Sequence, residues 1–200
     1  MIVVTPHFGD AVLSCGELLA ANPGSIVVTV FAGIPENAFV VPDWDAACGF
    51  SSPRQAVTVR RREERRALEI LDAEPCWLNC PESQYRRTES LDEVRLRLAR
   101  ALRRHRAERI AIPAGMIPGD HATANAAMLA LGKPDLEWVV YDDSPPLTRE
   151  VVATPAERYE HYLKGRAVES YESLQRGYFT AGRDLQSCLR VPERYWTLPR

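Results

Sequence analysis

Short apolar runs and longer amphipathic stretches follow one another along the chain. Most of the short runs have apolar residues at consecutive positions, which is typical of parallel strands that are covered on both faces. The strands predicted in this way are Ile2–Thr5, Ile26–Phe31, Pro75–Asn79, Arg109–Pro113 and Glu137–Asp143. Between them, apolar residues recur every three or four positions, as on one face of a helix. The predicted helices are Asp10–Ala21, Gln55–Asp72, Ser90–Arg104, Ala122–Leu131 and Thr154–Gln175.

The alternation of strand and helix predicts one α/β domain that covers residues 1–200. Its sheet should be mostly parallel with helices on both faces, a Rossmann-like arrangement, because strand–helix–strand units fold their crossover helix back onto the sheet. At the start of the third predicted helix, Ser90 and Glu93 form a capping-box pattern. Residues beyond Gln175 show no clear period and are expected to be irregular.

A long stretch from Ala32 to Pro53 interrupts the pattern with prolines, aspartates and aromatic residues. Loops of this length in compact domains are usually either functional or disordered. The segment Asp43–Phe50 is too aromatic for a plain linker. It is therefore predicted either to form a wall or lid of the functional site or to pack on the surface.

Charge and composition exclude several classes of function. The net charge of −2 gives no reason to expect nucleic acid or an anionic membrane as a partner. No apolar run approaches the roughly 18 residues of a membrane span, and no signal peptide is predicted. The five cysteines are an odd number and are expected to be reduced thiols. We therefore expect a cytoplasmic protein. The first turn lacks Gly-x-Gly-x-x-Gly, so no NAD is expected.

A histidine and an aspartate follow the first predicted strand. His7 and Asp10 lie in the turn before the next helix, at the carboxyl edge of the expected sheet, where ligands usually bind. A second strand–loop–helix carries the same two residue types, Asp120 and His121. Imidazole and carboxylate are ligands that zinc accepts. Such pairs are also common in ordinary turns, so the residues alone leave both interpretations open.

The order of residues in the first loop resembles a known family. Thr-Pro-His-Phe-Gly-Asp-Ala-Val-Leu-Ser-Cys-Gly, from Thr5 to Gly16, is similar to the opening motif of the PIG-L/LmbE-like zinc-dependent N-deacetylases. That motif is Pro-His-Pro-Asp-Asp followed by an apolar helix. The resemblance implies that His7 and Asp10 bind zinc. It also implies a general base at position 9, where this chain has Gly9.

The second loop is similar to the family's His-x-Asp-His motif. Aligned on the last residue, His121 would be the third zinc ligand and Asp120 a catalytic carboxylate. Pro118 stands where the family often has another histidine. The resemblance extends to the helix after the long loop, where Arg60 matches an arginine that reaches the substrate and Arg61 is the second choice.

The resemblance implies an LmbE-like fold and a zinc-dependent hydrolase that removes an N-acyl group, such as N-acetyl, from an amino sugar or a small natural-product metabolite. Such catalysis needs a carboxylate to take a proton from water and a protonated group to serve the leaving amine. Gly9 cannot accept a proton and Pro118 cannot donate one. Three hypotheses follow: a hydrolase with another base, a metal site with non-hydrolytic chemistry, or a non-catalytic binding protein. The candidate bases are Asp120, Glu82, Asp43, Asp45 and a group of the substrate.

Overall fold

The computed structural model of the chain describes residues 1–36, 40–85, 89–132, 136–143 and 159–198. Within these ranges the strands form one six-stranded sheet in the order β3-β2-β1-β4-β5-β6. Neighbouring strands pair in parallel except β5 and β6, which are antiparallel. The strands are β1 (Ile2–Thr5), β2 (Ser25–Thr29), β3 (Ala73–Trp77), β4 (Arg109–Pro113), β5 (Glu137–Tyr141) and β6 (Tyr195–Thr197).

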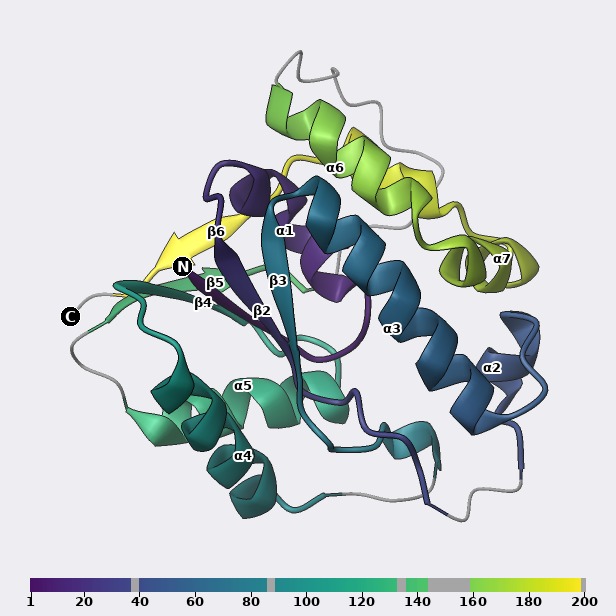
Figure 1. Ribbon diagram of the computed structural model, residues 1–200, viewed down its shortest axis with the longest axis horizontal. Coiled ribbons are helices and arrows are strands. Elements are labelled where there is room, and N and C mark those ends of the chain that lie inside the picture. Colours follow the sequence, from purple (N-terminus) through teal and green to yellow (C-terminus); the bar gives the residue numbers. More distant parts are fainter. Residues whose placement is uncertain (37–39, 86–88, 133–135, 144–158, 199–200) are drawn as a thin grey trace.

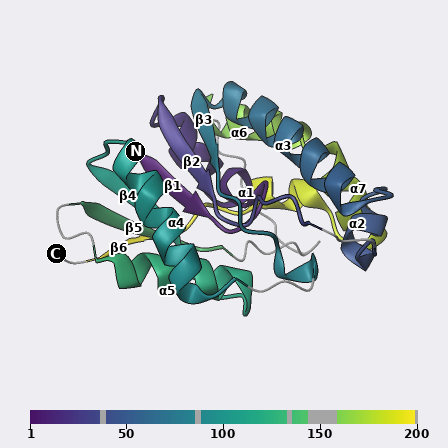
Figure 2. The same ribbon diagram turned by 60° about the horizontal axis from the view of Figure 1, so that its bottom comes forward.

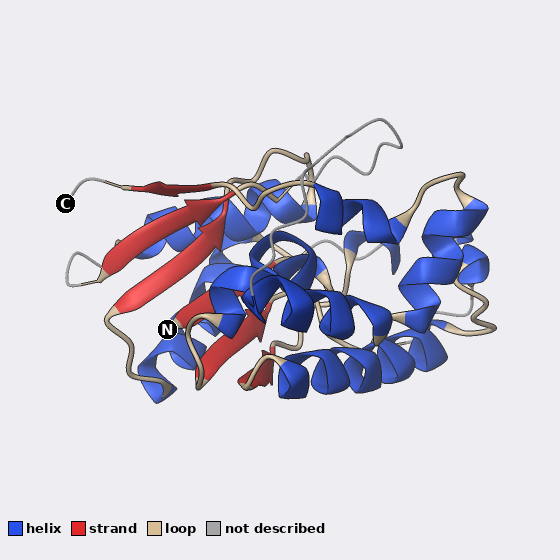
Figure 3. Ribbon diagram, turned by 90° about the horizontal axis from the view of Figure 1, so that it is seen from above, coloured by secondary structure: helices blue, strands red, loops and turns tan. Residues whose placement is uncertain are grey.

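Helices cover both faces of this sheet, which confirms the predicted α/β class (Figure 1). The helices are α1 (Asp10–Ala20), α2 (Asp43–Ala47), α3 (Pro53–Ile70), α4 (Leu91–Arg104), α5 (Asp120–Leu131), α6 (Tyr159–Glu169) and α7 (Glu172–Thr180). α1, α3 and α6 lie over one face; α4 and α5, which Figure 2 brings forward, lie over the other. Figure 3 shows the strands side by side, with β6 as an outer strand. Of the helices in the described ranges, none combines the length and apolar character needed to cross a membrane.

Alternate residues of the central strands point to opposite faces and build two cores. Val3 and Val27 belong to the core under α1, α3 and α6, whereas Val4 and Val28 belong to the core under α4 and α5. All four side chains are buried. Because both faces of the sheet are apolar, the strands are apolar at consecutive positions, which is the pattern that predicts them.

The start of α4 confirms the capping box. Oγ of Ser90 accepts a hydrogen bond from the N–H of Glu93 (3.3 Å), and the Glu93 carboxylate accepts one from the N–H of Ser90 (2.8 Å). These bonds satisfy N–H groups that the first turn of a helix leaves without an intrahelical partner. The cap orients α4 so that Val94 and Leu98 are buried against the sheet.

The C-terminal part of the chain differs from the prediction. The sequence predicts one helix over Thr154–Gln175, but α6 ends at Glu169 and α7 begins at Glu172; residues 154–158 lie outside the described residues. The break falls at Tyr171, whose ring is buried and whose backbone (φ −93°, ψ 63°) is not helical. Beyond α7 the chain is not irregular, because it forms the 3-10 turn η2 (Leu185–Arg190) and then β6. The three residues of β6 are exposed, so no buried face marks this strand in the sequence.

A buried ion pair fixes the C-terminal segment to α1. The backbone of Cys15 is non-helical (φ −135°, ψ 19°), so α1 is kinked there. Just after the kink, the carboxylate of Glu193 accepts hydrogen bonds from the N–H groups of Glu17 (2.8 Å) and Leu18 (3.2 Å). Nζ of Lys164 lies 2.8 Å from the same carboxylate, and the two charged side chains are 1% and 3% exposed. The C-terminal segment thus links α6 to α1, the helix whose first residue is the predicted ligand Asp10.

The five cysteines are free thiols, as predicted.

Candidate metal centre

The strand order reverses at β1, and the predicted chemistry collects there. β1 pairs with β2 on one side and with β4 on the other, so the loops after β1 and β4 leave neighbouring strands. His7 and Asp10 follow β1, and Asp120 and His121 are the first residues of α5, after β4. Crevices at such topological switch points are the usual ligand sites of open α/β sheets. The fold therefore brings the two motifs together.

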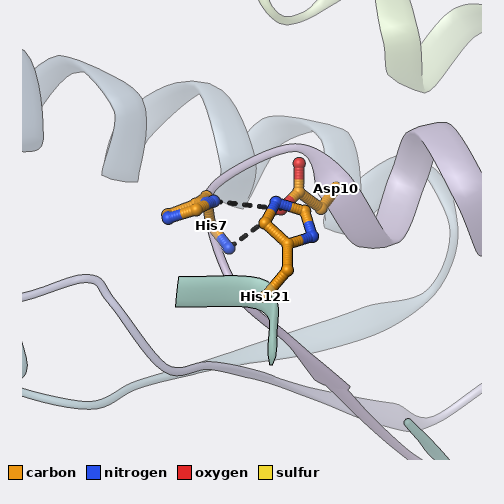
Figure 4. Close-up of side chains that lie close together, drawn as sticks. All are labelled: His7, Asp10 and His121. Carbon is orange, nitrogen blue, oxygen red and sulfur yellow. Dashed lines mark hydrogen bonds and ion pairs between the residues drawn. The ribbon is translucent and has the colours of Figure 1, made fainter. Parts of the chain in front are cut away.

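His7, Asp10 and His121 point toward one another and form a compact cluster (Figure 4). One donor atom from each lies within 4.8 Å of the others. Oδ2 of Asp10 lies 3.4 Å from Nδ1 of His7 and 3.6 Å from Nε2 of His121. The N–H of His7 also donates to Oδ2 of Asp10 (3.0 Å), which fixes the turn between the two residues. In the part of the chain that the structure describes, this is the one group of three such side chains close enough to share an ion.

A second carboxylate holds each histidine by its other ring nitrogen. Nε2 of His7 lies 3.0 Å from Oδ2 of Asp120, and Nδ1 of His121 lies 2.8 Å from Oδ2 of Asp143. A carboxylate in this position fixes the orientation and tautomer of a metal-binding imidazole. The donor atoms left facing Asp10 are Nδ1 of His7 and Nε2 of His121.

Backbone N–H groups hold these two carboxylates in turn. Asp120 accepts from Ser83 (3.0 Å), and Asp143 accepts from Gly115 (3.2 Å) and Met116 (3.3 Å). Burial alone would raise the pKa of both aspartates, but the hydrogen bonds from the histidines and the backbone lower it. Asp120 and Asp143 are therefore charged at neutral pH.

The environment of His7 favours a cation. Burial by itself opposes a charged ring, but the carboxylates of Asp10 and Asp120 raise the pKa of His7 to about 10. An imidazole must be neutral at the nitrogen that binds a metal, so an ion entering this cluster displaces a proton.

The donor set suits a zinc ion. Two imidazoles and one carboxylate are three ligands of the kinds that zinc prefers, and they leave one tetrahedral position for water or substrate. The surrounding carboxylates of Asp10, Asp120 and Asp143 balance the charge of a divalent cation. The described residues therefore fit a single zinc ion of the catalytic type.

The cluster lines a pocket of about 370 Å³. One part of the lining is polar and comprises Arg60, Glu82, Ser83, Gln84 and Asp120. The other part is apolar or aromatic and comprises Phe8, Leu13, Trp44, Ile117, Pro118, Leu174 and Tyr178. Trp44 belongs to the segment Asp43–Phe50, so this segment contributes one residue to the lining of the pocket, as the first of its two predicted roles requires.

The structure distinguishes the candidate bases by whether they line the pocket. Asp120 and Glu82 line the pocket, whereas Asp43 and Asp45 do not. Asp45 is fully buried and accepts a hydrogen bond from the hydroxyl of Tyr85 (2.9 Å). Asp120 and Glu82 are thus the two carboxylates, besides the ligand Asp10, in the lining of the pocket.

Arg60 lines the pocket, but its guanidinium is held by its own chain. Nη2 lies 2.8 Å from Asp45 and Nη1 lies 3.7 Å from Glu82, and the Arg60 side chain is 2% exposed. Burial alone would lower the pKa of Arg60, but the two carboxylates raise it above its usual value. Arg60 therefore stabilises the polar part of the pocket lining. Direct contact between Arg60 and the substrate stays a prediction. Arg61 does not line the pocket; it donates to the backbone carbonyl of Ala32 (2.7 Å).

Gly9 stands where the resemblance implies a general base. Its φ of +90° lies in the left-handed region that favours glycine. A Cβ at this position would lie 2.6 Å from Cδ1 of Leu174 and 3.6 Å from the ring of Tyr171. The nearby carboxyl of Glu64 faces the N–H of Gly9 (3.4 Å), but Glu64 is 1% exposed and does not line the pocket. The space beside Gly9 is therefore filled by side chains of the α7 region rather than by a base.

Two parts of the site escape the sequence analysis. The sequence does not identify Asp143 as the partner of His121, although Asp143 lies two residues after β5 at the carboxyl edge of the sheet, a position that could indicate it. Leu174 and Tyr178 on α7 carry no local signal, because their place in the pocket depends on how α7 packs.

Removing the charge of Asp143 should weaken metal binding. Asp143→Asn keeps the shape of the side chain but not the carboxylate that orients His121, and loss of such a partner typically lowers metal affinity by roughly 10–100-fold. Zinc affinity can be measured by competition with a chromophoric chelator. Asp92→Asn, at an exposed position on α4, is the control. Equal affinities for Asp143→Asn and the wild type would contradict the orienting role.

A doubly wound α/β domain with a two-histidine, one-carboxylate cluster at its switch point defines the structural class. The chain belongs to the PIG-L family, since the family model described as GlcNAc-PI de-N-acetylase matches residues 2–131. That stretch contains His7, Asp10 and His121 and ends before Asp143 and α7. No curated protein matches the chain in sequence.

Solved structures share the fold. A triple mutant of Orf2, a deacetylase of the teicoplanin biosynthetic pathway, has a TM-score of 0.73 and 24% identity, covering 88% of this chain and 82% of that chain. N,N′-diacetylchitobiose deacetylase from Pyrococcus horikoshii has a TM-score of 0.62 and 16% identity, covering 99% and 83%. The 4-carboxy-2-hydroxymuconate hydratase GalB from Pseudomonas putida has a TM-score of 0.57 and 16% identity, covering 90% and 82%. These similarities confirm the predicted LmbE-like fold.

Proposed function

We propose that the protein is a zinc-dependent hydrolase that removes an N-acyl group from an amino sugar or a small metabolite. The observation that carries this proposal is the cluster of His7, Asp10 and His121, whose donor atoms lie within 4.8 Å of one another in the lining of a pocket. The proposal is supported by the PIG-L family match and by structural similarity to the deacetylases Orf2 and N,N′-diacetylchitobiose deacetylase.

Zinc at this cluster would polarise the acyl carbonyl and lower the pKa of a water molecule to about 7. Asp120 is the group we assign to accept the proton of the attacking water. It lines the pocket, its lowered pKa keeps it charged, and His7 and Ser83 hold its Oδ2 in place. Glu82 is the alternative base, since it lines the same pocket.

Two matched variants test which of these two carboxylates is the general base. Loss of a positioned base typically lowers the rate by roughly 10²–10⁴-fold. We expect that effect on kcat for Asp120→Asn and a smaller effect for Glu82→Gln, both measured at equal zinc content. The reverse order would assign the base to Glu82. Equal metal content is the necessary control, because Asp120 also holds the ligand His7.

We propose that Arg60, anchored on the buried Asp45, contributes to substrate binding by holding Glu82 in the pocket lining, where Glu82 can meet the hydroxyl groups of a sugar. The distances of 2.8 Å and 3.7 Å to these carboxylates support this role. Arg60→Lys retains the charge but loses the planar fork of donors. We expect it to raise KM more than it lowers kcat.

The test is an amine-release assay on the zinc-loaded protein with a panel of N-acylated amino sugars and small amides. We expect slow release of a primary amine that depends on zinc. His121→Ala should abolish it, whereas His105→Ala, at the end of α4, should not. A protein that holds zinc and binds panel members but releases no amine would contradict the hydrolase proposal.

A second function is favoured by Gly9 and Pro118, which replace two groups of the hydrolytic machinery. In this alternative the metal centre catalyses a non-hydrolytic step or binds a ligand without turnover. Its support is the similarity to GalB, which shares the fold and is a hydratase. Tight binding of an N-acylated sugar with no release of amine would favour this function over hydrolysis.

A further inference from the structure

We infer that the substrate of this centre carries an apolar acyl group larger than acetyl, an alkyl chain or an aromatic ring, which packs against Leu174, Trp44 and Tyr178. The inference rests on the proposed function, because it names the substrate class of the same centre. It is supported by the apolar side chains that occupy the space beside Gly9, where a larger residue would place its own side chain.

The space beside Gly9 directly adjoins the metal centre. Gly9 stands in the chain between the ligand positions His7 and Asp10. The position that its Cβ would take lies 2.6 Å from Cδ1 of Leu174 and within van der Waals distance of the Tyr171 ring. An apolar wall from α7 thus stands where a relative with a general base would present a carboxylate.

This wall is firmly built. The N–H and Oγ of Ser173 donate to the buried carboxylate of Glu63 at 2.8 and 2.5 Å, which fixes the first turn of α7. The rings of Trp44 and Tyr178 pack edge to face with centroids 5.3 Å apart. A Cβ on Gly177 would come within 2.9 Å of Trp44, so α7 and α2 are in close contact. Leu174, Trp44 and Tyr178 therefore form one preorganised surface.

Another part of the pocket lining is polar and includes Glu82, Ser83 and Gln84. A scissile amide has two substituents, the amine with its sugar and the acyl group. Sugar hydroxyls need hydrogen-bond partners when they are buried, so the sugar belongs on the polar side. The acyl group is then directed to the apolar side. The pocket volume of about 370 Å³ lies within the usual range for small-molecule ligands and leaves room for a group larger than a methyl.

Linear hydroxamic acids test the wall without requiring turnover. A hydroxamate can chelate a metal through its two oxygens and directs its alkyl chain as an acyl group would be directed. Burial contributes about 0.8 kcal/mol per methylene, so we expect the affinity for hexanohydroxamate to exceed that for acetohydroxamate by roughly 10²-fold. The affinities can be measured by calorimetry on the zinc-loaded protein.

Polar substitutions in the apolar wall should reduce the ratio of the affinity for hexanohydroxamate to that for acetohydroxamate. We expect Leu174→Asn and, as an independent variant, Trp44→Ser to lower it to roughly tenfold or less, since each removes part of the apolar surface. Leu129→Asn, at a position on α5 that is 53% exposed, should leave it unchanged.

If the wild type binds both hydroxamates equally, the inference is wrong while the proposed hydrolysis can still hold. Chain-length dependence without any amine release would instead uphold the wall and contradict the hydrolase. If the zinc-loaded protein binds neither hydroxamate, the inference is overturned as well.

Discussion

An aspartate at position 9 is expected to accelerate N-acyl hydrolysis only when Leu174 is shortened as well. In Gly9→Asp alone, the new Cβ would lie 2.6 Å from Cδ1 of Leu174, on a backbone with φ +90°. The strain should leave the rate at or below the wild-type value. In Gly9→Asp combined with Leu174→Ala, the methyl groups that block the carboxylate are gone. The new carboxylate then stands where the resemblance implies the base, without the bonds to His7 and Ser83 that engage Asp120, and we expect kcat to rise by at most the roughly 10²–10⁴-fold that a positioned general base contributes.

Aspartate is a reasonable choice at this position, because Asp and Asn tolerate a positive φ better than most residues with a side chain. Leu174→Ala alone is the control, and its kcat should not rise. The rates are compared on a short-chain substrate at equal zinc content, so that the change in the apolar wall does not decide the result. An equal gain in Gly9→Asp alone would show that α7 does not block position 9. No gain in the double variant would show that the pocket does not hold an amide in place for hydrolysis.

Loss of the Glu193 carboxylate is expected to destabilise the fold strongly. Glu193→Ala leaves the ammonium of Lys164 without its partner at a site where that side chain is 1% exposed, and it removes the acceptor for two N–H groups of the kinked helix α1. Breaking a buried ion pair in this way typically lowers the free energy of unfolding by about 3–5 kcal/mol. The change can be measured as a lower urea midpoint with an unchanged slope.

Two further variants test whether the loss of stability is specific to the ion pair of Glu193 and Lys164. Glu69→Ala removes an exposed carboxylate from α3 and should change the stability by about 0.5 kcal/mol or less. The double variant Glu193→Ala with Lys164→Met removes both charges and should recover part of the loss, because no unpaired ammonium remains. A loss no larger than that of Glu69→Ala would contradict the bracing role of Glu193.

The sequence predicts the parts of the molecule in which each element carries its own signal. β1, β2 and β4 are apolar at consecutive interior positions because both faces of the sheet are covered, and Ser90 with Glu93 marks the start of α4 by purely local hydrogen bonds. The clustering of His7, Asp10 and His121 could also be predicted, since each lies between a recognisable strand and the first turn of the following helix, in a segment that resembles a family motif.

The remaining features depend on contacts between distant parts of the chain. Tyr171 breaks the predicted C-terminal helix because its ring is buried, which no helical period reveals. Asp143 acquires its role only when β5 is placed so that its end lies beside His121. Leu174 fills the space beside Gly9 only because α7 folds back onto the start of α1. In each case the sequence supplies the residue type and the tertiary packing supplies the function.

The most direct test of the metal centre is elemental analysis of the protein purified without added metal, beside His121→Ala prepared in parallel. Three ligands at one cluster predict about one zinc ion per chain in the wild type and a large loss in the variant. If the wild type contains no metal and takes none up from excess zinc, the cluster of His7, Asp10 and His121 is not a metal site, and the proposed hydrolysis is contradicted with it.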